Sequence, residues 1–230
     1  MTTVVMVHGI RTSATMWRAQ LAHLQERDVP AVAVDLPGHG TRMAETFTLD
    51  GAFATIDEAV RTVSTAYVGG EERPPVDAFI AASCTAIPRG VGLATYRALA
   101  RGFDRLPDRG FRIAEWVLDR TLPPETRADF GAGGYAYDAQ DVALKSLSVL
   151  DLLAALRRIE VPTWFINGQY DQLRLNEKLF VSLVPHAELI VVPRTSHLVT
   201  AMRPRVFNAL LDLALATMDA EASVGATSTQ

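Results

Sequence analysis

Two residues, Asp171 and His197, could form a proton-transfer pair, and each comes shortly after a short apolar run. Asp171 follows the run 163–166 and the dipeptide Asn-Gly, and His197 follows the run 189–192. In open parallel sheets, ligands bind at the carboxyl ends of the strands. A carboxylate that holds one imidazole nitrogen leaves the other nitrogen to take a proton from a nucleophile. This pattern indicates an oriented carboxylate–imidazole pair that could transfer a proton.

The residues alone leave other interpretations of this pair open. His197 could be a surface-loop histidine beside a strand end. Asp171 could be the N-cap of a helix over 172–181, a role that is compatible with proton transfer.

The elements that must position these side chains alternate between strands and helices. Apolar residues recur at helical spacing in 16–26, 52–67 and 206–218. Short β-branched runs predict buried strands at 4–7, 31–34, 77–82, 163–166 and 189–192. Such alternation is typical of βαβ units, so we expect an α/β fold with a mainly parallel sheet flanked by helices.

Between 87 and 158 the pattern changes to helices only, with turns marked by proline and glycine. We interpret 87–158 as a helical cap inserted into a single domain that spans 1–230.

The composition excludes several functional classes. The chain has 230 residues, a net charge of −4 and one cysteine. Electrostatic binding of nucleic acid, a disulfide framework and a cysteine-based zinc site are therefore not expected. No apolar run could span a membrane, and no Gly-x-Gly-x-x-Gly follows a strand. We expect a cytoplasmic monomer or homodimer with no metal and no cofactor.

Four segments give a more specific indication. They are Val-His-Gly-Ile at 7–10, Asp-Leu-Pro-Gly-His-Gly at 35–40, Asn-Gly-Gln-Tyr-Asp at 167–171 and Ser-His-Leu at 196–198. In this order they resemble the α/β-hydrolase superfamily, over nearly the whole chain. The resemblance implies that Asp171 is the triad acid, that His197 is the base and that the Ile10 N–H belongs to the oxyanion hole. It also implies a small apolar ester or acyl substrate.

The chain departs from this family at the nucleophile. No Gly-x-Ser-x-Gly occurs. By comparison with the family's spacing, we expect about 20 residues, a strand and its nucleophile turn, to be missing near Val63 and Ser64. Cys84, in Ala-Ser-Cys-Thr-Ala after a predicted strand, is one candidate nucleophile; the alternative is a buried or pocket-lining thiol. The chain is thus predicted to be an esterase-like hydrolase, or else an impaired relative that keeps the pocket as a binding protein.

Overall fold

The computed structural model describes residues 2–63 and 76–227. Five strands lie in this part of the chain, close to the positions that the sequence predicts. Within each sheet, all neighbouring strands run parallel. The strands are β1 (Val4–Val7), β2 (Ala31–Val34), β3 (Phe79–Ala82), β4 (Thr163–Gly168) and β5 (Ala187–Val192).

The strand β4 is buried along its whole length, because it has neighbours on both edges and side chains packed on both faces. Trp164 and Ile166 pack into a core cluster that also contains Met6 of β1. Phe165 points the other way and meets Phe180, with ring centroids 5.8 Å apart. This period of two is the strand alternation that places apolar side chains on both faces of a covered sheet.

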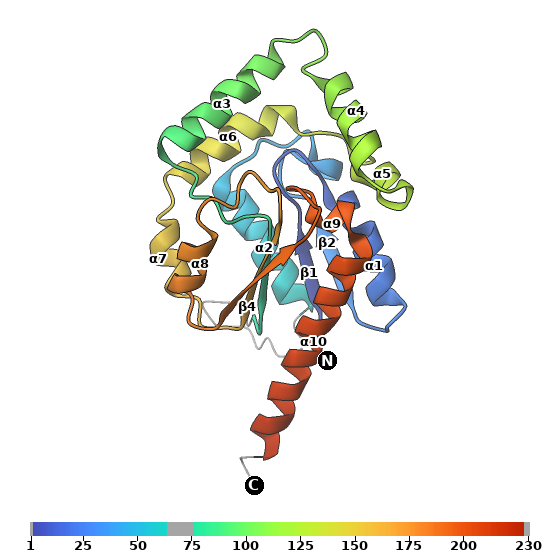
Figure 1. Ribbon diagram of the computed structural model, residues 1–230, viewed down its shortest axis with the longest axis vertical. Coiled ribbons are helices and arrows are strands. Elements are labelled where there is room, and N and C mark those ends of the chain that lie inside the picture. The colour runs from blue at the N-terminus through green and yellow to red at the C-terminus, as the bar shows by residue number, and fades with distance from the viewer. Residues whose placement is uncertain (1, 64–75, 228–230) are drawn as a thin grey trace.

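Helices flank the two sheets on both sides (Figure 1). Helices α1 and α10 lie together on one side of the strands, and α2 and α8 do not share that side. Their bounds are η1 (Ala14–Trp17), α1 (Arg18–Gln25), η2 (Gly40–Arg42), α2 (Leu49–Val63), α8 (Glu177–Leu183), α9 (Val199–Met202) and α10 (Pro204–Thr227). No helix in the described ranges has the length and hydropathy needed to cross a bilayer.

Between β3 and β4 the described chain forms helices only. Figure 1 shows α3, α4, α5 and α6 arching over the end of the molecule toward which the strands run. We refer to these four helices and their connections as the cap helices. The segment consists of α3 (Gly90–Asp104), α4 (Phe111–Thr121), α5 (Pro124–Phe130), α6 (Tyr137–Ser148) and α7 (Leu152–Leu156).

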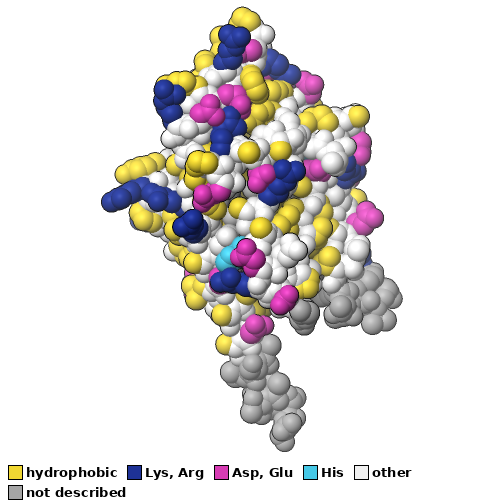
Figure 2. Space-filling model, turned by 90° about the vertical axis from the view of Figure 1, so that its right-hand side faces the viewer, with side chains coloured by type: hydrophobic (Ala, Val, Ile, Leu, Met, Phe, Trp, Pro, Cys, Tyr) yellow, Lys and Arg dark blue, Asp and Glu magenta, His cyan; other side chains and the backbone are white. Residues whose placement is uncertain are grey.

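The surface carries both charge and exposed apolar side chains. On the face shown in Figure 2, Lys and Arg side chains are interspersed with Asp and Glu. Large hydrophobic side chains are exposed on α3, α4 and the connection between them. They include Tyr96, Phe103, Leu106, Phe111, Ile113, Trp116 and Val117.

The strands form two separate sheets rather than one. One sheet has the order β1-β2 and the other has the order β3-β4-β5. Side chains of both sheets share one core cluster, so the sheets lie side by side. No ladder joins β1 to β3 in the described ranges. The position near Val63 and Ser64, where the sequence predicts a deletion, borders residues 64–75, which lie outside the described part.

The alternation of backbone bonds identifies which amides lie on the edges of β1 and β3 that have no neighbouring strand among the described residues. The Val4 N–H donates to Pro30 C=O at 2.9 Å, so even-numbered amides of β1 face β2. The Phe79 N–H donates to Pro162 C=O at 2.9 Å, so odd-numbered amides of β3 face β4. The amides of Val5, Val7, Ile80 and Ala82 therefore point away from their paired neighbours.

We expect these four amides to exchange hydrogen at least about tenfold faster than Met6 and Ala81, because they lack a ladder bond that must open first. Native-state hydrogen exchange measured residue by residue by NMR tests this. Met6 and Ala81 are matched controls, because each lies on the same strand with its amide on the paired edge. Equal protection of both sets would show that another segment pairs with these edges.

Candidate active site

Asp171 and His197 meet in the structure. The Nδ1 atom of His197 lies 3.1 Å from Oδ1 and 3.2 Å from Oδ2 of Asp171. The Asp171 side chain is fully buried, whereas 37% of the His197 side chain is exposed. Because an ionised carboxylate only accepts, Nδ1 carries the proton and Nε2 is left to accept another. The arrangement is that of a base oriented by an acid.

The environment of Asp171 keeps it ionised. Burial alone would raise its pKa, but the hydrogen bond and charge of His197 outweigh this, so the pKa of Asp171 lies below its ordinary value. The Leu173 N–H, 2.8 Å from Oδ1, acts in the same direction. Ser83 adds a smaller contribution that lowers the pKa, although its buried hydroxyl lies outside ordinary hydrogen-bond geometry.

The helix after Asp171 begins later than the sequence predicts. The expected helix starts at 172, whereas α8 begins at Glu177. Asp171 accepts the Leu173 N–H in a local turn, and Arg174 pairs with Glu177 at the helix start. A short side chain that bonds its own backbone two residues on favours a turn over a helix.

Gly168 allows the two loops to approach closely. A Cβ atom on Gly168 would lie 2.1 Å from the carbonyl oxygen of Ser196, the residue before His197. The Tyr170 N–H donates to Thr195 C=O at 2.8 Å, and Gln169 Oε1 accepts the Arg194 N–H at 3.0 Å. These bonds hold the acid loop against the histidine loop.

A buried polar network ties the end of β3 to the same loops. Asn167 Nδ2 donates to Thr85 Oγ1 at 2.8 Å and to Glu177 Oε2 at 3.0 Å. The Asn176 N–H donates to Thr85 C=O, and Asn176 Oδ1 accepts the Ile87 N–H. The segment that contains Ser83 and Cys84 is therefore fixed relative to Asp171.

The turn after β1 leaves the Ile10 amide without an acceptor among the described residues. The Gly9 carbonyl accepts the Thr12 N–H at 3.3 Å and the Thr12 hydroxyl at 2.8 Å, which closes the turn. Arg11 adopts a positive φ of 76° within it. The free Ile10 N–H is compatible with the oxyanion-hole role that the sequence resemblance implies, which stays a prediction.

The histidines near this turn have structural contacts. His8 Nε2 accepts the Leu36 N–H at 3.1 Å, so the ring is neutral, and burial lowers its pKa. His39 is buried and contacts Pro37 C=O through Nδ1. Asp35 accepts the Ala14 N–H at 2.7 Å and bonds Thr41, which joins the second segment to the loop after the first.

Cys84 lies near Asp171 but forms no hydrogen bond with His197. The residue as a whole is exposed, yet protein atoms enclose its thiol group. Desolvation, helped by the Asp171 charge, raises the pKa of Cys84 to about 12. The thiol is therefore protonated at neutral pH.

The structure brings Asp171 and His197 together and places Cys84 beside Asp171. Ile10 lies on a separate loop, linked to the histidine loop through side chains. Thr12 bonds Met16 Sδ at 3.3 Å, and Met16 packs against the same apolar cluster as Leu198. The close approach that Gly168 permits at the end of β4 was not predicted. The described residues contain no group of three potential metal ligands.

Comparisons with known proteins decide the family. The family model described as alpha/beta hydrolase family matches residues 4–210. The chain belongs to this family. No curated protein matches it.

Solved alpha/beta hydrolase-like structures show the same fold at low identity. An esterase from Exiguobacterium antarcticum is 16% identical with a TM-score of 0.75, covering 95% of this chain and 92% of that chain. An esterase from Thermogutta terrifontis is 19% identical with a TM-score of 0.70, covering 95% and 90%. A putative non-heme bromoperoxidase from Mycobacterium tuberculosis H37Rv is 14% identical with a TM-score of 0.70, covering 94% and 92%. The predicted fold class and superfamily are confirmed.

Substitution of Gly168 tests the close approach of the two loops. We expect Gly168→Ala to lower the free energy of unfolding by about 2–3 kcal/mol, because the new Cβ displaces the Ser196 carbonyl. Urea unfolding measures this. In the control Gly102→Ala, no atom lies within 4 Å of the new Cβ on helix α3, so stability should rise by about 0.5–1 kcal/mol. Equal effects would show that Gly168 does not limit the approach.

Alkylation of Cys84 tests its protonation. The thiolate is the reacting form, so iodoacetamide at pH 8 should label the folded protein at least about 100-fold more slowly than the urea-unfolded protein. The unfolded chain is the matched control, because it contains the same single cysteine. Similar rates in both states would contradict the raised pKa.

Proposed function

We propose that this alpha/beta hydrolase acts on small apolar ester or acyl compounds, with His197 as its proton-transferring base. The observation that carries the proposal is the contact of His197 Nδ1 with the buried Asp171 carboxylate at 3.1 Å. An imidazole so held needs no rearrangement before it accepts a proton at Nε2. Two esterases among the similar structures support the substrate class.

The reaction that fits these groups is acyl transfer to a thiol. Cys84 Sγ attacks the carbonyl carbon while its proton passes to His197 Nε2, and the carbonyl oxygen becomes an anion that accepts the Ile10 N–H. The C–O bond then breaks, and the alcohol leaves with the proton from His197. Water, deprotonated by His197, hydrolyses the thioester and returns Cys84 to its thiol form.

The raised pKa of Cys84 affects how this attack can occur. A preformed thiolate is rare at neutral pH, so the proton must leave during attack rather than before it. Water activated by His197 could attack the ester directly in place of the thiol, without an acyl-enzyme.

The exposed apolar side chains of α3 and α4 support an apolar substrate. Aromatic side chains such as Phe103 and Trp116 lie on these cap helices, 44% and 55% exposed. Transfer of a substrate's hydrocarbon groups from water to such surfaces would lower the free energy.

A second candidate is a catalytically impaired relative that uses the same pocket for binding. Two observations favour it: the described strands form two sheets with unpaired facing edges, and no described nucleophile is hydrogen-bonded to His197. Removal of one triad member leaves only the weak catalysis that binding and the oxyanion hole supply.

Hydrolysis of p-nitrophenyl butyrate tests the proposal. We expect His197→Ala to lower kcat/KM by at least about 100-fold, because general-base assistance is lost. His186→Ala is the matched control, since this histidine is exposed and lies outside the proposed site. If the two substitutions lower kcat/KM equally little, the pair is not catalytic and the chain is a binding protein.

The same assay with Cys84→Ala identifies the nucleophile. An acyl-enzyme mechanism predicts that Cys84→Ala lowers kcat/KM about as much as His197→Ala does. The intact mass of the unsubstituted protein after treatment with a thiol-reactive ester should then show one adduct, on Cys84. Unchanged activity without an adduct would assign the attack to water.

A further inference from the structure

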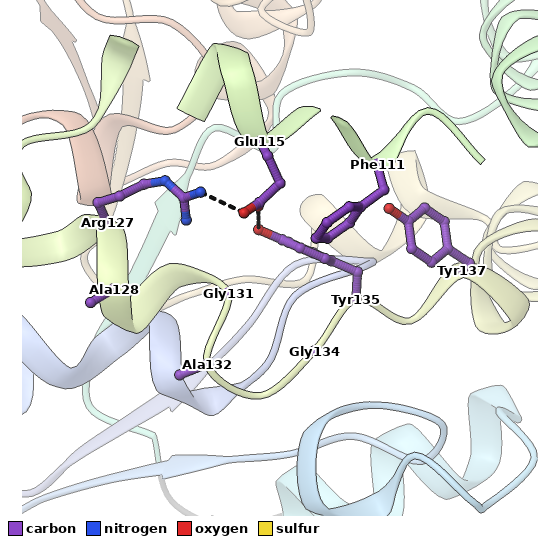
Figure 3. Close-up of a pocket in the computed structure, with 9 residues that line it drawn as sticks. All are labelled: Phe111, Glu115, Arg127, Ala128, Gly131, Ala132, Gly134, Tyr135 and Tyr137. Atoms are coloured by element: carbon purple, nitrogen blue, oxygen red, sulfur yellow. Dashed lines mark hydrogen bonds and ion pairs between the residues drawn. The ribbon is translucent and has the colours of Figure 1, made fainter. Parts of the chain in front are cut away.

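A pocket lies within the cap helices, apart from the Asp171–His197 pair. It has a volume of about 450 Å³ and opens to the surface. Its walls come from α4, α5 and the segment 131–137, as Figure 3 shows. None of its lining residues is Asp171, His197, Cys84 or Ile10. Its size falls within the range of small-molecule sites.

Aromatic rings form one side of the pocket. The ring centroids of Phe111 and Tyr135 lie 6.0 Å apart, and those of Tyr135 and Tyr137 lie 6.2 Å apart, both in edge-to-face arrangements. Small residues such as Ala128 and Ala132 lie on the opposite side and leave space in front of the rings. An aromatic ligand could add to this edge-to-face series.

The charged groups of the pocket already satisfy one another. Glu115 accepts the Tyr135 hydroxyl at 2.9 Å and Arg127 Nη2 at 2.6 Å. Arg127 also bonds Asp119 through Nε at 2.6 Å. Desolvation, together with Glu115, raises the pKa of Tyr135, which keeps this hydroxyl a donor. A charged ligand would find no free counter-charge in this wall, so the pocket favours a neutral one.

The Tyr137 hydroxyl is the polar group that is not satisfied. It is buried, and no described residue offers it a hydrogen bond. Figure 3 shows it turned toward the side where Phe111 lies. The guanidinium groups of Arg11 and Arg109 lie 4.4 Å and 4.8 Å from the Tyr137 ring centroid and restrict its movement. A buried hydroxyl without a partner is costly, so a bound group that pairs with it would be favoured.

We propose that this pocket is a second ligand site, separate from the Asp171–His197 pair, for a small neutral aromatic molecule that carries a hydroxyl group. The rings of Phe111 and Tyr135 contact its apolar part. The Tyr137 hydroxyl hydrogen-bonds its polar group after the exposed Phe111 side chain turns aside, since this hydroxyl is buried. The proposal does not depend on hydrolysis, and its test measures binding alone.

The experiment is a titration with 2-naphthol, followed by its fluorescence anisotropy and by calorimetry, with naphthalene as the apolar comparison. We expect 2-naphthol to bind with one molecule per chain. Tyr137→Phe should lower the affinity for 2-naphthol at least fivefold and change the affinity for naphthalene less than twofold, because only the hydroxyl is removed. Ala132→Trp, which fills the pocket, should weaken both at least tenfold, and Ala128→Trp provides a second blocking variant.

Two controls make the result decisive. Ala22→Trp adds the same side chain at an exposed position of α1 and should leave binding unchanged. His197→Ala should also bind 2-naphthol normally, whether or not the chain is a hydrolase. The site would be overturned if 2-naphthol did not bind with one molecule per chain. It would also be overturned if His197→Ala lost 2-naphthol binding while both blocking variants kept it. If Tyr137→Phe bound 2-naphthol as tightly as the unsubstituted protein, the role of the hydroxyl would be overturned.

Discussion

The close approach of the loops after β4 and β5 is the constraint from which the geometry of the site follows. The two strands run parallel in register, so their carboxyl ends lie side by side, and Gly168 leaves room for the Ser196 carbonyl at the point of closest contact. The contact between Asp171 and His197 follows from this approach, because each residue lies only a few positions beyond it. The contact in turn keeps Asp171 ionised although its side chain is fully buried.

The acid–base pair does not require the edge of β3 that faces β1. Strands β3, β4 and β5 form a sheet of their own, and Asn167 joins the segment after β3 to the start of α8 through Thr85 and Glu177. Each of these contacts lies within the three-stranded sheet or the loops at its end. Disruption between β1 and β3 would therefore separate the turn that contains Ile10 from the pair before it disturbed the pair itself. The pair of Asp171 and His197 thus belongs to the three-stranded sheet, and the turn with Ile10 belongs to the two-stranded sheet.

The sequence predicted those features that depend on neighbours along the chain. Buried β-branched runs located all five strands, and the motif order predicted that Asp171 and His197 follow adjacent strands. The start of α8 at Glu177 was not predicted, since it depends on whether Asp171 bonds the Leu173 amide or caps a helix, and both choices have similar local preferences. The cap pocket was not predicted either. Its wall joins Glu115 to Tyr135 across 20 positions, and helix packing, rather than local spacing, brings such pairs together.

The cap helices also control the surroundings of His197. The Thr126 hydroxyl of α5 donates to Ala201 C=O at 2.7 Å, and Leu118 of α4 packs in the same apolar cluster as Ala201 and Leu198. Ser196 is held in turn by Met202, whose sulfur accepts both its amide and its hydroxyl. The residues on both sides of His197 are thus fixed by the cap and by α9, while its own side chain is 37% exposed. A shift of α4 or α5 would move His197 relative to Asp171, so ordering of the cap is a condition for the proton transfer that we propose for this pair.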